Sequence, residues 1–448
     1  MRKIETFFIR TYGCQMNELD SEVMRGLLEK RNLTFTSDEE KADLIIFNTC
    51  AIRDLAERKV LGKIGQLSRK ETDRPIIGIT GCMANAKKES LFHKLPYVDF
   101  IIGTNNIHQL NTALDEVLEG KTPIYIDPTF TQELDYLSAK RTHAISAYVS
   151  IIRGCNNHCT YCVVPYTRGP EVSRTPEEIV KECRQLGEQG YKEITLLGQN
   201  VNSYGKDQPQ WNTLFPDLLD QLDQLPGIER IRFMTSHPVD ISRNLMEAIR
   251  DLSSVCEFVH FPLQAGSNRI LKKMHRKYTI EEYEEKVAML RSLVPNVSIG
   301  TDIIVGFPTE TEEEFEETAA ALKRIRFSTA FIFAYSKRKN TPAARWNDDI
   351  PQKTKEQRLH NLLDIQQNVT QEYLQMLIGT TVELLVESTS KDTTLLKGRT
   401  RQWQQVLFPG TTDKIGTIQQ VQIHSFSNQT CIGEVIASTA RQTSLPIR

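Results

Sequence analysis

The first 120 residues alternate short apolar runs with segments of helical periodicity. Apolar side chains are concentrated in Lys3–Tyr12, Leu44–Phe47 and Ile76–Ile79, and these segments predict buried strands. Between the first two, Glu18–Lys30 places its leucines and Val23 on one helical face. Because strands and helices alternate, we expect an open α/β domain over residues 1–120, with a parallel sheet covered by helices.

A second series of the same pattern begins near Ala144, after a polar, proline-containing connector at residues 121–143. Helical segments such as Pro176–Gln189 and Glu281–Leu293 separate its apolar runs. Six strand–helix units predict a partial (β/α)6 barrel over residues 144–375, with its active site at the carboxyl ends of the strands. The expected strands are Ser146–Ile152, Glu193–Leu197, Arg230–Met234, Phe258–Phe261, Val297–Val305 and Thr329–Phe333.

The pattern changes after the amphipathic segment Gln352–Ile378, which predicts a long helix that ends before Gly379. Short strands separated by turn residues then predict a small all-β barrel over residues 376–448. The expected strands are Val382–Glu387, Leu395–Arg399, Gln405–Phe408, Thr417–His424 and Gly433–Ala437. The fold class is therefore α/β, with a small all-β domain at the carboxyl end.

Composition and charge limit the possible functions. The net charge of −2 over 448 residues excludes an overall basic surface for nucleic acid, so any RNA-binding surface has to be local. The chain shows neither a signal peptide nor an apolar run long enough to span a bilayer, and we expect a cytoplasmic protein without membrane contact. Nine cysteines in such a protein favour metal binding or catalysis over disulfides.

Three cysteines at Cys155, Cys159 and Cys162 form a C-x3-C-x2-C motif. Three thiolates on a [4Fe–4S] cluster leave one iron open to an exchangeable ligand, which favours catalysis over simple electron transfer. A zinc site with His158 as a fourth ligand is the alternative. Structural zinc sites usually pair two short-spaced motifs, and a second pair is missing here.

Three earlier cysteines each follow a predicted strand directly. Because the carboxyl ends of parallel strands meet at one edge of a sheet, we expect these thiols to converge on a second cluster site. The alternative is that they are small buried side chains, which is our interpretation of Cys183, Cys256 and Cys431. The three converging cysteines are Cys14, Cys50 and Cys82.

Two further segments, Gly198–Asn200 and Ser298–Asp302, are predicted as loops at strand ends of the barrel. In a barrel that binds a nucleoside, they would contact its ribose and amino-acid end. The candidates for this role are Gly198, Gln199, Asn200, Ser298, Gly300 and Asp302. By contrast, the acidic segment Glu310–Glu317 is interpreted as the first turn of a helix, where carboxylates favour the helix dipole.

The tail segment Lys397–Trp403 interleaves basic residues with an aromatic side chain. On a small β-barrel this combination favours RNA contact through phosphates and base stacking. The alternative is a solvated strand edge whose charges prevent aggregation.

Together, these motifs resemble those of a known enzyme family. The Cys155–Cys162 loop followed by Val-Val-Pro-Tyr-Thr-Arg-Gly169 resembles the core of the radical S-adenosylmethionine enzymes. With the three earlier cysteines, the whole chain is similar to the methylthiotransferases of that superfamily, which end in an RNA-binding TRAM barrel. The motifs that resemble the bacterial tRNA branch are Thr11–Asn17, Asn48–Arg53, Gly198–Asn202, Thr235–Pro238, Ile304–Pro308, Thr341–Ala344 and Gly398–Arg401. Trp403 departs from the family, because a polar residue is expected there.

The resemblance implies two [4Fe–4S] clusters, one on each cysteine triad. S-adenosyl-L-methionine would bind the Cys155–Cys162 cluster, and its one-electron reduction would give methionine and a 5′-deoxyadenosyl radical. This radical would take hydrogen from C2 of N6-isopentenyladenosine at position 37 of tRNA. The other cluster would present sulfur, and a second S-adenosylmethionine would supply the methyl group. The implied product is 2-methylthio-N6-isopentenyladenosine.

The implied partners are a tRNA that carries isopentenyladenosine and a one-electron reductant such as flavodoxin or ferredoxin, and the expected form is a monomer. Two alternatives stay open. Related enzymes act on threonylcarbamoyl-adenosine of tRNA or on an aspartate of a ribosomal protein. A different class would be a non-enzymatic iron–sulfur protein for RNA binding or electron transfer, although such carriers usually ligate all four irons with cysteine.

Overall fold

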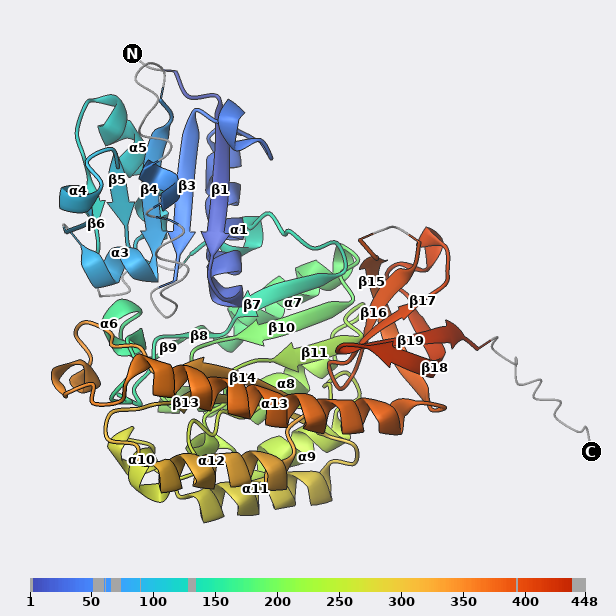
Figure 1. Ribbon diagram of the computed structural model, residues 1–448. Coiled ribbons are helices and arrows are strands. Elements are labelled where there is room, and N and C mark those ends of the chain that lie inside the picture. Colours follow the sequence, from blue (N-terminus) through green and yellow to red (C-terminus); the bar gives the residue numbers. More distant parts are fainter. Residues whose placement is uncertain are drawn as a thin grey trace, which may run out of the picture.

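The computed structural model describes residues 3–50, 60, 62–65, 74–88, 90–127, 134–391 and 394–436. An N-terminal sheet stands over a central partial barrel, and a small C-terminal barrel lies at one side of it (Figure 1). Among the described helices, none combines the length and apolar composition that crossing a bilayer requires.

The N-terminal domain is a six-stranded parallel sheet of order β2-β1-β3-β4-β5-β6. Its central strands β3 and β4 are buried at every residue, because helices cover both faces of the sheet. Part of the connector expected at residues 121–143 joins this domain, since β6 pairs with β5. The elements are β1 Thr6–Tyr12, α1 Gln15–Lys30, β2 Thr34–Phe35, β3 Leu44–Thr49, β4 Ile76–Gly81, α3 Cys82–Lys87, α4 Ser90–Lys94, β5 Phe100–Ile102, α5 Leu110–Leu118 and β6 Ile124–Tyr125.

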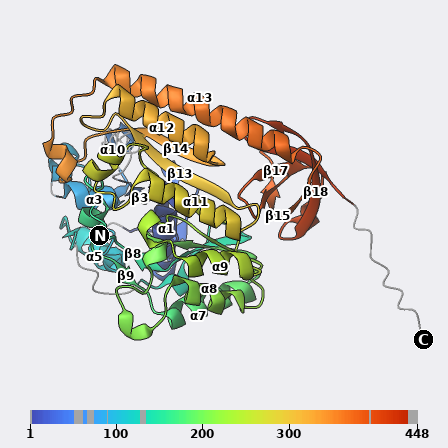
Figure 2. The same ribbon diagram turned by 90° about the horizontal axis from the view of Figure 1, so that it is seen from below.

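The central domain is the expected partial barrel of six parallel strands. They form two three-stranded sheets, β7-β10-β11 and β12-β13-β14, which adjoin between β11 and β12. Figure 2 shows the helices on the outer side of these strands. The elements are β7 Ser146–Ser150, α7 Pro176–Glu188, β10 Glu193–Leu197, α8 Phe215–Asp223, β11 Arg230–Phe233, α9 Arg243–Asp251, β12 Phe258–His260, α10 Asn268–Lys273, α11 Ile280–Leu293, β13 Ser298–Val305, α12 Glu312–Ile325 and β14 Thr329–Ala334.

The C-terminal domain is a closed five-stranded barrel of order β15-β16-β17-β19-β18, as expected. The long helix α13 (Gln352–Leu377) packs on β14 and α12 at one end, and its Leu374 enters the core of the small barrel at the other (Figure 1). The helix ends before Gly379, whose φ of +82° favours glycine. The strands are β15 Thr381–Thr389, β16 Leu396–Thr400, β17 Gln405–Phe408, β18 Ile418–Ser427 and β19 Thr430–Val435.

Two buried arginines of β11 fasten the small barrel to the central domain. Arg232 donates to the carbonyls of Thr400 (2.7 Å) and Arg401 (2.8 Å), and to the carboxylate of Glu193 (2.7 Å). Arg230 donates to the carbonyl of Arg399 at 2.6 Å. The turn between β16 and β17 is thus held by charge-assisted hydrogen bonds, which are stronger than neutral ones.

Arg401 and Trp403 of the same turn also make contacts with the central domain. Arg401 donates to Glu257 (2.8 Å) and to the carbonyl of Val255 (2.5 Å). Trp403 stacks on Phe258 at 5.6 Å between ring centroids, with Arg232 over its ring at 5.0 Å. Both side chains therefore pack against the central barrel, and the RNA contact of Lys397–Trp403 stays a prediction.

Removing the Arg232 guanidinium tests this junction. We expect Arg232→Met to lower the free energy of unfolding by about 3–5 kcal/mol, since it leaves the buried Glu193 carboxylate without its partner. Arg243→Met is the matched control, because its ion pair with Glu247 is exposed and should contribute less than about 1 kcal/mol. Urea unfolding followed by circular dichroism measures both, and equal losses would contradict the assignment.

Candidate functional site

The three N-terminal cysteines lie at one edge of the N-terminal sheet, as predicted. Cys14 follows the end of β1 by two residues, while Cys50 and Cys82 come directly after β3 and β4. These three strands are parallel neighbours, and their last residues pair in register. Three thiols from distant parts of the sequence are therefore brought to the same edge.

Buried amides hold the first of these loops in place. Asn17 donates from Nδ2 to Oδ1 of Asn48 at 3.0 Å, and Asn48 donates to the Asn17 carbonyl at 2.7 Å. Both side chains are fully buried. Since Asn17 lies one turn after Cys14 and Asn48 precedes Cys50 by two residues, this pair fixes the two cysteine loops relative to each other.

A glycine allows the third loop to approach the second. Gly81 has a φ of +88°, and a Cβ on it would lie 2.5 Å from the carbonyl oxygen of Thr49. Only glycine fits such a position without strain. The chain can therefore start α3 at Cys82 immediately beside the end of β3.

The second triad lies on the loop after β7, at the carboxyl end of the barrel strand. The short strand β8 (Ile152–Arg153) leads into this loop, and it returns through α6 (Val164–Thr167) and β9 (Val172–Ser173). The backbone N–H of Cys155 donates to the carbonyl of Gly169 at 3.1 Å, which closes the loop at its base.

The three thiols of this loop interact with one another. Burial is the main cause that raises the pKa of Cys155 to about 11 and that of Cys162 to about 12, and the interaction with Cys159 contributes to both shifts. All three are free thiols. In the iron-free loop at neutral pH, the thiols of Cys155 and Cys162 are therefore protonated and bind metal only after losing their protons.

Within the described part of the chain, no three His, Cys, Asp or Glu side chains are arranged to hold a single metal ion. Around one zinc ion, sulfurs bound at 2.3 Å would lie only about 3.8 Å apart. The lack of such a group among the described residues does not support the zinc alternative. His158, the proposed fourth ligand, is exposed, and its backbone carbonyl lies near His275. Iron–sulfur clusters are held by cysteine sulfurs, and each of the two groups supplies three free thiols. The donor atoms therefore fit two such clusters.

The two triads belong to loops that pack on each other. Helix α3, which begins at Cys82, contacts α6, which begins two residues after Cys162. Figure 1 shows α3 directly above α6. The hydroxyl of Thr104 also donates to the carbonyl of Thr167 at 2.9 Å. The carboxyl edge of the N-terminal sheet thus faces the carboxyl end of the barrel.

The predicted loop Gly198–Asn200 supports the Cys155 loop. Gln199 accepts a hydrogen bond from the backbone N–H of Gly154 at 2.6 Å, directly before Cys155. Asn200 is buried and accepts from the backbone N–H of His237 at 3.1 Å. The role of these residues toward S-adenosylmethionine stays a prediction.

The segment Ser298–Asp302 lies in a strand, which confirms the predicted strand Val297–Val305, whereas the prediction of a strand-end loop at these residues is wrong. It forms the first five residues of β13, because the backbone of Ser298 already donates to the carbonyl of Glu257 and the pairing continues from there. Gly300 and Asp302 lie on one face of this strand, opposite His260 and Phe331 in register. Their contact with a cofactor stays a prediction.

The inner face of the barrel carries a buried histidine whose ring makes no hydrogen bond within the described residues. His260 is buried, its ring nitrogens have no hydrogen-bond partner among the described residues, and Nε2 lies 3.4 Å from Asp302. Beside it, Phe331 on β14, the edge strand of its sheet, is 43% exposed. This face is therefore suited to an organic ligand that has both ring and polar atoms.

Two buried arginines next to the cysteines were not predicted. Arg276 donates to Sγ of Cys159 at 3.4 Å, and Arg168 interacts with Cys82 and Cys14. Arg168 is part of the motif that follows Cys162, but nothing in that motif shows which way its side chain points. Arg276 is distant in sequence and carries no such signal.

The predictions for the remaining three cysteines are confirmed, and that for the acidic segment is confirmed except at Glu310. Cys183, Cys256 and Cys431 are buried thiols. The acidic segment starts α12, where Thr311 and Glu314 form a capping box. Its first residue, Glu310, is instead buried and accepts from Arg358 at 2.7 Å.

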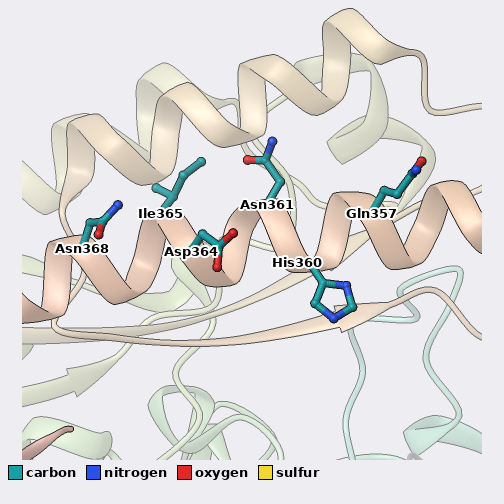
Figure 3. Close-up of a pocket in the computed structure, with 6 residues that line it drawn as sticks. All are labelled: Gln357, His360, Asn361, Asp364, Ile365 and Asn368. Atoms are coloured by element: carbon teal, nitrogen blue, oxygen red, sulfur yellow. The ribbon is translucent and has the colours of Figure 1, made fainter.

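A hollow on the outer side of α13 is separate from this site (Figure 3). Polar, mostly exposed side chains line it, and no cysteine is among them. The lining residues are Gln357, His360, Asn361, Asp364, Ile365 and Asn368. Nothing in this hollow resembles a catalytic arrangement.

Comparisons with known proteins agree with this architecture. Residues 149–322 match the Radical SAM superfamily, residues 6–103 match Uncharacterized protein family UPF0004, and residues 375–436 match the TRAM domain. The tRNA-2-methylthio-N(6)-dimethylallyladenosine synthase of Protochlamydia amoebophila is 65% identical over 97% of both chains. The chain belongs to this synthase family.

The protein of the same name from Thermoanaerobacter pseudethanolicus is 47% identical over 96% of this chain and 92% of its own. Among solved structures, the radical S-adenosylmethionine methyltransferase TsrM from Kitasatospora setae matches with a TM-score of 0.57 and 14% identity, over 76% of this chain and 77% of that one. At that identity the likeness concerns the fold alone. The synthase family accounts for all three domains, and its chemistry requires S-adenosylmethionine and [4Fe–4S] clusters.

The raised thiol pKa values predict the reactivity of the iron-free enzyme. Because only the thiolate reacts, alkylation of Cys155 should still increase about ninefold between pH 9 and pH 10. A thiol with a pKa of 9.0 would increase only about twofold over that range. Mass spectrometry of the Cys155 peptide after iodoacetamide treatment measures the rate, and a plateau above pH 9 would show that burial does not raise this pKa.

Proposed function

We propose that this enzyme adds a methylthio group to C2 of N6-isopentenyladenosine at position 37 of tRNA, giving 2-methylthio-N6-isopentenyladenosine. The observation that carries the proposal is full-length similarity to synthases named for this product, at up to 65% identity. The joined loops of the two cysteine triads support it, because sulfur delivery and radical formation have to occur at one base.

The ligand assignment follows from the two groups of free thiols. Cys14, Cys50 and Cys82 would hold one [4Fe–4S] cluster. The second cluster, and S-adenosylmethionine with it, belongs to the triad Cys155, Cys159 and Cys162. When bound, these groups supply the electron, radical, sulfur and methyl chemistry that side chains cannot perform on an unactivated C–H bond.

The chain's own residues position these groups. Gln199 fixes the backbone before Cys155, and Arg276 donates a hydrogen bond to Cys159. The exposed ring of Phe331 offers a stacking surface on the inner face of the barrel, next to Asp302. A base splayed out of a single-stranded anticodon loop suits such a surface.

The partners follow from the reaction. One-electron chemistry needs a reductant, for which we propose a flavodoxin or ferredoxin. Because the proposed substrate is a tRNA, we propose that the enzyme acts in the cytoplasm, and that it acts as a monomer. Since the side chains of Arg401 and Trp403 pack against the central barrel, we propose that the C-terminal domain contacts tRNA mainly through other residues of its surface.

Iron analysis tests the two cluster sites. We expect the variant Cys155→Ala, Cys159→Ala, Cys162→Ala to keep about four irons per chain after anaerobic reconstitution, because the other triad is independent. The reciprocal variant at Cys14, Cys50 and Cys82 should also keep about four. A triple variant with no iron, or with the full content of the unmodified enzyme, would contradict two separate three-cysteine sites.

Nucleoside mass spectrometry tests the substrate. In a strain that lacks this enzyme and any paralogue, tRNA should lose 2-methylthio-N6-isopentenyladenosine and accumulate N6-isopentenyladenosine. Expression of the intact chain should restore the product, whereas the Cys155→Ala variant should not. Persistence of the product, or loss of a methylthio group from threonylcarbamoyl-adenosine instead, would assign the enzyme to another substrate.

A further inference from the structure

Arg168 connects the two cysteine sites. It lies six residues after Cys162 and is 4% exposed. Its guanidinium donates a hydrogen bond to Asp20 of α1 at 3.0 Å and interacts with Cys82 and Cys14 of the N-terminal domain. The side chain therefore leaves the loop of one triad and reaches the thiols of the other.

Part of this guanidinium is without a hydrogen-bond partner. Nη2 donates to Oδ2 of Asp20 at 3.0 Å, whereas Nη1 is buried and bonds to no atom of the described residues. The other oxygen of Asp20 accepts from Arg153 at 2.8 Å. A buried N–H donor without an acceptor is costly, which indicates that an acceptor is supplied when the site is complete.

The cysteines indicate the nature of this acceptor. Cys14 and Cys82 interact with Arg168 and with each other. An iron–sulfur cluster held by these thiolates carries negative charge and has sulfur atoms that accept hydrogen bonds. Positive charge and hydrogen bonds at the sulfurs stabilise the reduced form of such a cluster.

We propose that Arg168 is a positioning residue of the N-terminal cluster site, where its Nη1 donates to sulfur and its charge raises the reduction potential of the cluster. The inference rests on the proposed function, in that it requires a cluster on Cys14, Cys50 and Cys82. Arg276 makes the equivalent contact with Cys159 in the other triad. Each triad therefore has one buried arginine, and Arg168 reaches its triad from the opposite domain.

Arg141 is the control that distinguishes a role of Arg168 at the cluster from a role in domain packing. Arg141 also joins the two domains, since it donates to Glu22 of α1 at 3.2 Å and to Glu182 of α7 at 2.5 Å. Its side chain is as buried as that of Arg168. No contact of Arg141 involves the six cysteines of the two triads, so its loss should loosen the domains without changing the cluster.

The experiment uses the full-length chain with Cys155, Cys159 and Cys162 replaced by alanine, so that only the N-terminal cluster is bound. Arg168→Gln, Arg168→Lys and Arg141→Gln are added one at a time. Anaerobic reconstitution gives the iron content, and a dithionite titration followed by electron paramagnetic resonance gives the midpoint potential of the one-electron reduction.

We expect Arg168→Gln to keep its iron and shift the midpoint to a more negative potential, with a smaller shift in Arg168→Lys and none in Arg141→Gln. Loss of iron in Arg168→Gln while Arg141→Gln keeps it also supports the proposal. An unchanged midpoint in Arg168→Gln, or equal effects in Arg141→Gln, would overturn it. Absence of iron before any arginine is replaced would instead refute the two-cluster function itself.

Discussion

The arrangement of the site depends on one buried carboxylate. Asp20, on the first helix of the N-terminal domain, binds Arg153 with one oxygen and Arg168 with the other. Both arginines belong to the barrel, on either side of its cysteine loop. Because buried charges are tolerated only when they are paired, the two domains are held in the one orientation that satisfies these ions. That orientation brings the carboxyl edges of two parallel sheets together.

In parallel sheets, the functional residues usually lie at this carboxyl edge. Loops at the carboxyl ends of parallel strands converge, so each sheet contributes a cluster of thiols without any long irregular segment. The reacting base has to reach both sites, and a shared boundary between them meets that requirement. The C-terminal barrel is fixed to the far side of the same unit by Arg230, Arg232 and α13, which keeps its position constant relative to the site.

Much of this arrangement was predictable from local patterns. Cys14, Cys50 and Cys82 each follow an apolar strand, and parallel order alone brings them to one edge. The spacing of Cys155, Cys159 and Cys162 specifies a single loop. The strands and the long helix α13 also follow from periodicity, because each buries a continuous apolar face.

Contacts between segments that are distant in the sequence could not be predicted in this way. Arg168 and Arg276 meet cysteines of other loops, and no local pattern specifies such a meeting. Arg401 and Trp403 have the composition of an RNA-binding surface, yet the shape of the β16–β17 turn points them at Glu257 and Phe258. Ser298–Asp302 was predicted both within the strand Val297–Val305 and as a strand-end loop, and its pairing with β12 makes it a strand.

The central claim is that two iron–sulfur clusters occupy facing loops of one chain. Electron paramagnetic resonance of the fully reconstituted, dithionite-reduced enzyme tests it most directly. Two neighbouring paramagnetic clusters should broaden each other's signals and shorten each other's relaxation times, relative to variants that hold one cluster. A spectrum equal to the sum of the two single-cluster spectra, with unchanged relaxation, would contradict the account.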